Sequence, residues 1–124
     1  MNSGLIELLS IETVHEEPGL MVMEMPVTEK VFQPFGYLHG GASVVLAETA
    51  ASMGATSLVG DDEITFGMEI NANHMKTKQS GTLTAKAKCR HQGRTTQIWE
   101  IEITDEVEEI VCLSRCTMAV KKKR

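Results

Sequence analysis

Residues 33–58 read QPFGYLHGGASVVLAETAASMGATSL, and this stretch decides the fold. From residue 40 onward, Ala, Val, Leu and Met leave almost no polar face, and a helix that is apolar nearly all round is usually buried. Gly60, a residue type that often ends helices and forms turns, follows this stretch. We therefore predict one long helix over residues 40–58. Other elements of the chain must wrap around it.

Glu48 is the anomaly in this helix. Burying an unpaired carboxylate is costly, so its side chain must be paired with an Arg or His, exposed at a helix edge along a subunit boundary, or functional. Ser52 lies four residues further on the same helix face, where its hydroxyl can orient the carboxylate or a water molecule beside it. The pattern leaves the structural and the functional explanation of Glu48 open.

Four segments after the helix alternate apolar and polar residues with the period of a β-strand. They cover residues 64–74, 82–91, 95–104 and 109–120. The first segment places six residues on one side, which we expect to be buried: Ile64, Phe66, Met68, Ile70, Ala72 and His74. Short connections favour antiparallel pairing of strands that are neighbours in sequence. The predicted architecture is an α+β fold, with one antiparallel sheet wrapped around one long central helix.

Two weaker segments precede the long helix. Residues 4–11 place leucines at helical spacing, which predicts a short amphipathic helix. Residues 20–27 are rich in Met and Val and predict a strand, in which Pro26 indicates an edge position or the strand end. No linker or repeat interrupts the pattern, so we expect a single domain over residues 1–124.

Composition and charge argue against several classes of protein. The net charge of -5 disfavours nucleic-acid binding, which depends on clustered Lys and Arg, and the basic residues 121–124 are expected to form a solvated tail. Cys89, Cys112 and Cys116 lack the spacing of a zinc site or a disulfide framework, so we expect no metal and a reducing cytoplasm. A membrane-spanning run and the charged start of a signal peptide are both missing, so we expect no membrane association.

Gly40 and Gly41 are poor helix formers at a predicted helix start. Their presence is explained if a ligand approaches the backbone where the first amide groups point outward, because these amides can hold a developing oxyanion. A plain helix-entry turn explains them as well. Gly40 and Glu48 are eight residues apart, which is about 12 Å along a helix axis. If both act on one substrate, Gly40 of one subunit must face Glu48 of another, so we predict a dimer-formed active site.

Gln33 and His39 flank the loop that enters the helix. Each can hydrogen-bond a substrate carbonyl or fix the loop, and the pattern leaves both roles open. Basic residues gather at two predicted turns, with Lys76 and Lys78 at one and Arg90 and Arg94 at the next. Successive turns lie at opposite ends of a sheet, so these two groups could bind one polyphosphate only if they came from different subunits. The alternative is that they are solvated surface charges.

Three motifs in this order resemble the hotdog-fold acyl-CoA thioesterases of the phenylacetic-acid-degradation type. They are residues 33–48 (QPFGYLHGGASVVLAE), residues 69–74 (EINANH) and residues 91–96 (HQGRTT), which precede Trp99. The resemblance covers nearly the whole chain. Within the family, the chain looks most similar to bacterial 1,4-dihydroxy-2-naphthoyl-CoA hydrolases of menaquinone synthesis and to their aryl-CoA relatives.

The resemblance implies roles for individual residues. Glu48 matches the nucleophile or general base, Gly40 the oxyanion amide, and Ser52 a hydroxyl near the attacking water. Gln33 and His39 match groups that position the thioester carbonyl. The implied substrate-binding residues are His74 in the acyl-pocket region, Met53, Lys76, and the CoA-contacting turn with His91, Gly93, Arg94, Thr95 and Thr96.

The predicted function is therefore hydrolysis of an aryl- or acyl-CoA thioester to the free acid and CoA, without a cofactor. The resemblance implies a homo-oligomer, with a tetramer built as a dimer of dimers. A hotdog dehydratase acting on 3-hydroxyacyl thioesters and a non-catalytic acyl-CoA binding module are the alternative functions. Thiol release from acyl-CoA distinguishes the hydrolase from both.

Overall fold

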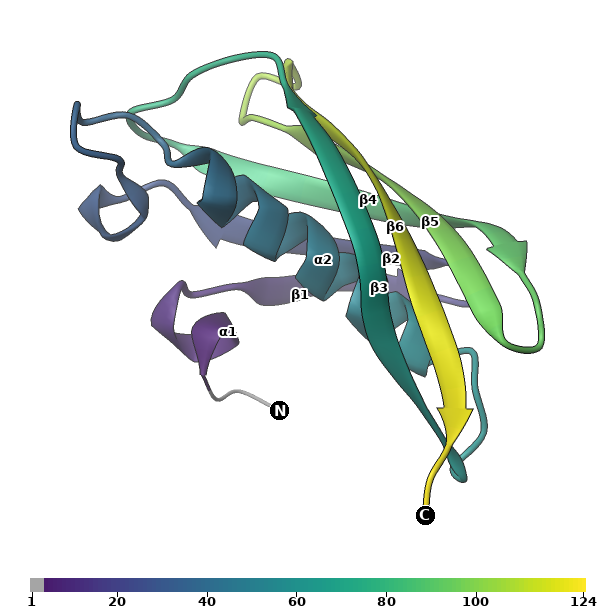
Figure 1. Cartoon of the computed structure of the whole chain (residues 1–124). Coiled ribbons are helices and arrows are strands. Elements are labelled where there is room, and N and C mark those ends of the chain that lie inside the picture. The colour runs from purple at the N-terminus through teal and green to yellow at the C-terminus, as the bar shows by residue number, and fades with distance from the viewer. Residues whose placement is uncertain (1–3) are drawn as a thin grey trace.

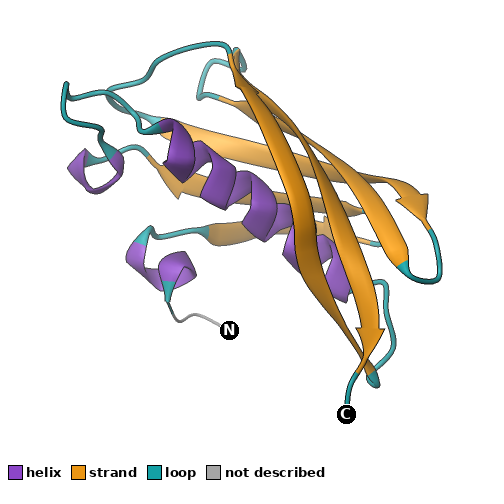
Figure 2. Cartoon of the chain, viewed as in Figure 1, coloured by secondary structure: helices purple, strands orange, loops and turns teal. Residues whose placement is uncertain are grey.

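A computed structural model describes residues 4–124 and shows one six-stranded antiparallel sheet around one long helix. The helices are α1 (Leu5–Leu8), the short 3-10 helix η1 (Glu29–Val31) and α2 (Gly40–Thr56). The strands are β1 (Glu12–Glu17), β2 (Leu20–Pro26), β3 (Glu63–His74), β4 (Thr82–Gln92), β5 (Thr96–Thr104) and β6 (Ile110–Lys122). The strand order is β1-β2-β4-β5-β6-β3, and the strands curl around α2 (Figures 1 and 2). The α+β architecture predicted from the sequence is confirmed.

The long helix begins and ends where the sequence predicted, within two residues. His39 caps its N-terminus, because the ring Nδ1 accepts a hydrogen bond of 2.8 Å from the Gly41 amide. The Ser57 hydroxyl donates to the Gly54 carbonyl at 2.7 Å and closes the other end. Small residues along one face let the helix approach the sheet closely. The fully buried residues on this face include Leu46, Ala47, Ala50, Ala51 and Ala55.

The expectation that α2 is buried all round was wrong for one face. Val45, Glu48, Thr49, Ser52 and Met53 are only partly buried. The sheet covers the opposite side of α2, and α1 lies near this less covered face. The apolar composition of the helix therefore serves two surfaces, a packed one against the sheet and a partly open one.

The N-terminal region differs from its prediction in two ways. The expected helix over residues 4–11 is the single turn α1, and β1 was not predicted at all. All residues of β1 are exposed, so its sequence ETVHEE carries no alternation that could reveal a strand. Pro26 does end β2, as expected, but β2 pairs on both sides, with β1 and with β4, and is not an edge strand.

Strand β3 departs most from the sequence prediction. It pairs with β6 and not with its sequence neighbour β4, because residues 75–81 cross over to the other side of the sheet. A bulge between Gly67 and Glu69 also reverses the side on which side chains point. Phe66 and Met68, expected to be buried, are 52% and 62% exposed. β3 thus forms a sheet edge that has no partner strand within the described residues.

Within residues 4–124, no helix is long and apolar enough to cross a membrane.

Candidate active site

Glu48 lies at the middle of α2 on its partly open face. Its carboxylate packs against Gly67 of β3, where a Cβ atom would collide with Oε2. None of the ion pairs formed within residues 4–124 involves Glu48, so the pairing with an Arg or His that would explain it structurally is not found there. An unpaired carboxylate at an open helix face is available to accept a proton or to attack a substrate carbonyl.

A groove of about 330 Å³ runs along this face of α2. Glu48, Ser52 and Met53 line it together with Leu5 and Ile6 of α1. The sequence prediction that Ser52 shares a helix face with Glu48 is therefore confirmed, and Met53 lies beside them.

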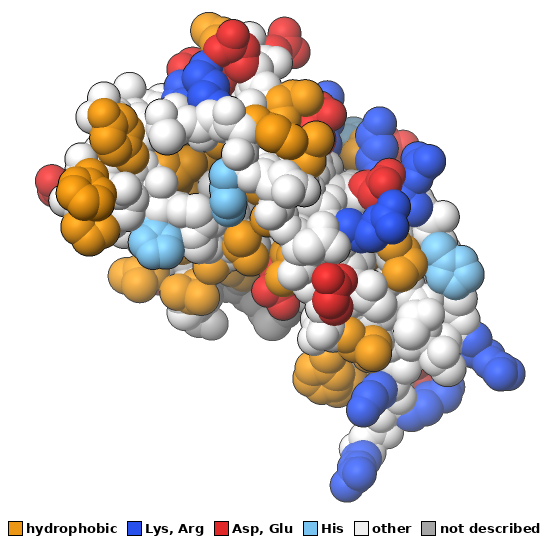
Figure 3. Space-filling model, turned by 45° about the horizontal axis from the view of Figure 1, so that its top comes forward, with side chains coloured by type: hydrophobic (Ala, Val, Ile, Leu, Met, Phe, Trp, Pro, Cys, Tyr) orange, Lys and Arg blue, Asp and Glu red, His pale blue; other side chains and the backbone are white. Residues whose placement is uncertain are grey.

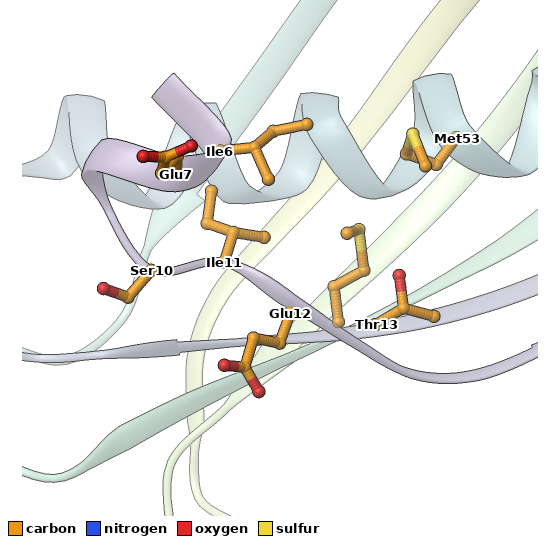
Figure 4. Close-up of a pocket in the computed structure, with 8 residues that line it drawn as sticks. Ile6, Glu7, Ser10, Ile11, Glu12, Thr13 and Met53 are labelled. Atoms are coloured by element: carbon orange, nitrogen blue, oxygen red, sulfur yellow. The ribbon is translucent and has the colours of Figure 1, made fainter. Parts of the chain in front are cut away.

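A second cavity, of about 520 Å³, lies between α1, α2 and the start of β1. It shares Ile6 and Met53 with the groove, and Ile11 and Met53 are among the labelled side chains around it in Figure 4. Apolar side chains thus continue from the Glu48 carboxylate into the space beneath α1.

The N-terminus of α2 forms a separate group of predicted site residues. The His74 ring at the end of β3 lies over Gly40, since a Cβ atom on Gly40 would come within 2.8 Å of His74 Nε2. Only glycine allows this approach without displacing the ring. His39 and His74 are both exposed. On the face shown in Figure 3, histidine rings lie at the surface, some of them near hydrophobic side chains and some beside Lys and Arg.

The side chains of Gln33 and His39 both accept hydrogen bonds that stabilise the loop before α2 and the start of the helix. The Gln33 Oε1 atom accepts hydrogen bonds from the amides of Phe35 and Tyr37, and the second of these measures 3.3 Å. His39 Nδ1 is occupied by the helix cap. The Gln33 amide group and the other ring nitrogen of His39 are the polar atoms left for a substrate.

The predicted CoA-contacting turn lies at the far end of α2. The Gly93 amide donates to the Thr96 carbonyl at 2.8 Å, and the Thr95 carbonyl accepts from Val120 at 2.9 Å. A Cβ atom on Gly93 would come within 2.9 Å of Nε2 of the exposed His91, so a larger residue there would have to displace that ring. Arg94 is exposed. Figure 1 shows the turn between β4 and β5 at the end of the sheet opposite the crossover between β3 and β4.

Lys76 lies on that crossover, and its ammonium group is already engaged. It donates to Asp105 at 2.7 Å and also pairs with Glu109. These two carboxylates raise the pKa of Lys76 above its ordinary value through hydrogen bonding. Of the three ammonium hydrogens, one is left for another partner.

The chain thus brings the predicted residues together in three separate groups. Glu48, Ser52 and Met53 form one, Gly40 and His74 form the second with His39 and Gln33 nearby, and the turn with Arg94 forms the third. Glu48 and Gly40 remain about 12 Å apart along the axis of α2. One chain does not place a carboxylate and an oxyanion amide on the same substrate atom.

Sequence reasoning missed two neighbours of Glu48. A glycine inside an alternating strand indicates a close approach of another group, and Gly67 carried this signal. Cys116 of β6 is fully buried, and its pKa is raised to about 11 by burial and by the negative charges of Glu48 and Glu69. Its thiol stays protonated and does not compete with Glu48 as a nucleophile.

Comparisons with known proteins agree with this fold. A family model described as the thioesterase superfamily matches residues 35–112. A 1,4-dihydroxy-2-naphthoyl-CoA hydrolase from Listeria monocytogenes is 61% identical over 121 residues, which cover 98% of this chain and 98% of that protein. A protein of the same name from Escherichia coli is 39% identical over 117 residues, which cover 94% of this chain and 86% of that protein.

A solved structure has the same shape. It is a Staphylococcus aureus protein crystallised as a glutamate-to-alanine mutant, with a TM-score of 0.94 and 44% sequence identity, and the match covers 96% of this chain and 99% of that one. The family model spans more than half of the chain, and the sequence relatives span nearly all of it. The chain therefore belongs to the thioesterase superfamily, adopts the hotdog fold that its sequence predicted, and is a thioester hydrolase.

Proposed function

We propose that the protein hydrolyses an aryl- or acyl-CoA thioester to the free acid and CoA, with 1,4-dihydroxy-2-naphthoyl-CoA as the first substrate to test. Two relatives carry the name of that hydrolase, at 61% and 39% identity. The observation that carries the proposal is Glu48, an unpaired carboxylate in a groove with Ser52 and Met53. Hydrolysis needs only water besides the thioester, so the proposal includes no cofactor. Three free cysteines fit a reducing, cytoplasmic compartment.

In the proposed reaction, the amide of Gly40 polarises the thioester carbonyl while Glu48 acts on the carbonyl carbon. Glu48 either removes a proton from a water that attacks, or attacks itself to form an anhydride that water then hydrolyses. In both routes the carbon–sulfur bond breaks, CoA leaves as the thiol, and the acyl group leaves as a carboxylic acid. Gln33 and His39 position the carbonyl, and the Ser52 hydroxyl orients the attacking water.

The remaining contacts follow the three groups of residues. His74 and Met53 are proposed to contact the acyl group. Arg94, with the turn formed by His91, Gly93, Thr95 and Thr96, is proposed to contact CoA. Lys76 has one ammonium hydrogen left for the same ligand.

We also propose that the active unit is a dimer of the single domain formed by residues 1–124, and that two dimers form a tetramer. Two observations support the dimer. Gly40 and Glu48 are too far apart in one chain, and β3 leaves a sheet edge open beside Glu48, with the apolar side chains of Phe66 and Met68 exposed on it. Pairing two β3 edges about a two-fold axis would bring Glu48 of one subunit toward Gly40 of the partner subunit.

The variant Glu48→Gln tests the function. We expect steady-state thiol release to fall by about 10²-fold to 10⁴-fold, because an amide cannot take a proton or attack, while the fold and CoA binding are retained. The substrate panel contains aryl and aliphatic acyl-CoA thioesters, including the naphthoyl thioester. Single turnover in heavy-oxygen water separates the two routes, since only the anhydride route places the label in Glu48. Near-normal turnover by the variant would refute the assignment.

Mixing two variants, each expected to have low activity by itself, tests the shared site. Glu48→Gln supplies an intact Gly40, and Gly40→Ala, whose added Cβ displaces the His74 ring, supplies an intact Glu48. After subunit exchange, each mixed dimer has one complete site, so activity should return to about a quarter of the wild-type value. No recovery by mixed dimers, isolated with two different affinity tags, would show that each chain works alone.

A further inference from the structure

The crossover formed by residues 75–81, called the strap below, passes the N-terminus of α2. It starts directly after His74, the residue whose ring lies over Gly40. The Lys78 carbonyl on the strap accepts a hydrogen bond of 2.8 Å from the Leu38 amide, one residue before the helix cap His39. The strap therefore contacts the chain just before the proposed oxyanion amide, and it begins at the residue after the histidine that packs against that amide.

Asp105 holds the strap from the turn between β5 and β6. Its side chain has no exposed area, and each oxygen has two donors. Oδ1 accepts from the amides of Val107 and Glu109 at 3.0 and 2.9 Å. Oδ2 accepts from the ammonium groups of Lys76 and Lys78 at 2.7 and 3.4 Å.

This arrangement exceeds what a turn requires. The two amide bonds at Oδ1 suffice to shape residues 105–109, as aspartate does in many turns. A carboxylate without solvent contact is costly unless it is paired, and here both cations that compensate it come from the strap. Glu106 adds a further bond of 2.9 Å to Lys78. The charged half of the cluster therefore joins the turn to the strap.

We propose that Asp105 is a positioning residue for thioester hydrolysis: by holding Lys76 and Lys78, it fixes the strap that follows His74 and whose Lys78 carbonyl accepts from the Leu38 amide just before the helix cap. The inference rests on the proposed role of Gly40 as the oxyanion amide. An error of about 1 Å in the placement of a reacting group costs up to about 10²-fold in rate, so a loose strap lowers turnover without touching the substrate.

The test compares wild type with Asp105→Asn. Asparagine keeps an oxygen for the amides of Val107 and Glu109, so the turn is retained, whereas the charge that holds the two lysines is removed. We expect kcat for thiol release to fall about 10-fold or more, with KM nearly unchanged. Hydrogen exchange of the Leu38 amide should accelerate, while that of the Leu46 amide in the middle of α2 should not.

Two further variants keep the test decisive. Lys78→Met removes the tie from the side of the strap, so it should reproduce the effect, and the double variant should be no worse than either single one. If the Asp105→Asn variant does not fold, Lys78→Met alone serves as the test. Glu100→Gln is the matched control, because it removes a carboxylate that pairs with Arg90 and Arg115 at 3.1 and 3.3 Å on exposed strand positions, and it should change nothing.

Unchanged kcat and unchanged Leu38 exchange in both Asp105→Asn and Lys78→Met would overturn the inference. A rise in KM at constant kcat would overturn it as well, because that result assigns the cluster to substrate binding. If the wild type releases no thiol from any thioester, the proposed function fails, and this outcome is distinct from an active wild type whose Asp105→Asn variant is equally active.

Discussion

Two glycines let a side chain approach the backbone closely, and the two contacts differ in what they bring together. Gly54 of α2 faces the ring of Trp99, where an added Cβ would lie 2.6 Å from the ring. Gly67 of β3 faces the carboxylate of Glu48. The first contact is apolar and fully buried, whereas the second holds a charged group beside an open groove. The same device thus serves packing at one place and proposed chemistry at the other.

The two contacts also differ in how easily the side chain that faces the glycine can move away. The Trp99 ring is 0% exposed, and its Nε1 atom donates to Gln97 Oε1 at 2.8 Å, so the ring cannot move away. The Glu48 carboxylate is the flexible end of a partly exposed side chain and can move. We therefore expect changes at Gly54 to act on stability and changes at Gly67 to act on turnover.

Gly67→Ala should give the largest effect. The new Cβ displaces the Glu48 carboxylate, so we expect kcat to fall by about 10²-fold. Stability should stay equal or rise, since alanine is better than glycine in a strand by roughly 0.5–1 kcal/mol. Steady-state thiol release and urea unfolding measure the two effects. A loss of stability with normal kcat would place Gly67 among the packing contacts.

Gly54→Ala should give the opposite result with a smaller magnitude. Overpacking against Trp99 costs about 1–3 kcal/mol, and the better helix propensity of alanine returns about 1 kcal/mol. We expect a net loss of up to about 2 kcal/mol in the free energy of unfolding, with kcat of the folded protein nearly unchanged. Chemical denaturation followed by the single tryptophan measures it. A gain of about 1 kcal/mol would mean that the Trp99 ring moves away without cost.

Acid should loosen the strap before it affects the Trp99 contact. The lysines hold the pKa of Asp105 well below its usual range, chiefly through the hydrogen bond from Lys76. Because the pKa is lowered in the folded protein, this stabilisation is fully present above the unfolded value of about 4 and is lost progressively as the pH falls from there through the lowered folded value. The protection of the Leu38 amide against exchange, relative to its intrinsic rate at each pH, should therefore begin to decrease below about pH 4, ahead of any change in tryptophan emission. Asp105→Asn should remove this pH dependence.

Lys122→Met should give the smallest effect. It removes an ion pair of 2.8 Å with Asp62, and both side chains are at least 70% exposed. Exposed pairs contribute little, so the melting temperature should change by less than about 2 °C and kcat should not change. A larger change in melting temperature would show that the ion pair at the end of β6 contributes more to stability than an exposed pair usually does.

Much of the fold was predictable because its signals are local. The helix over residues 40–58 and the strands after residue 82 follow from periodicity, and each was found within two residues of its predicted bounds. Strand β1 could not be predicted, because an exposed edge strand needs no apolar alternation. The pairing of β3 with β6 and its bulge at Gly67 depend on contacts between segments far apart in sequence.

The candidate site divides in the same way. Glu48 and Ser52 are four residues apart on one helix, so their shared face followed from the helical repeat. The approach of His74 to Gly40 and the hold of Asp105 on the strap required the crossover between β3 and β4. The sequence showed these groups only as a strand end, a helix start and a turn.

By itself, the sequence determined the long helix, its lone carboxylate and the family, since each depends on residues close together in the chain. Only the tertiary structure decided which side of the helix stays open, which glycine receives the Glu48 carboxylate and which turn holds the strap. The physical reason is that these contacts join segments whose order in space is set by strand pairing across the whole sheet, and no local pattern encodes that order.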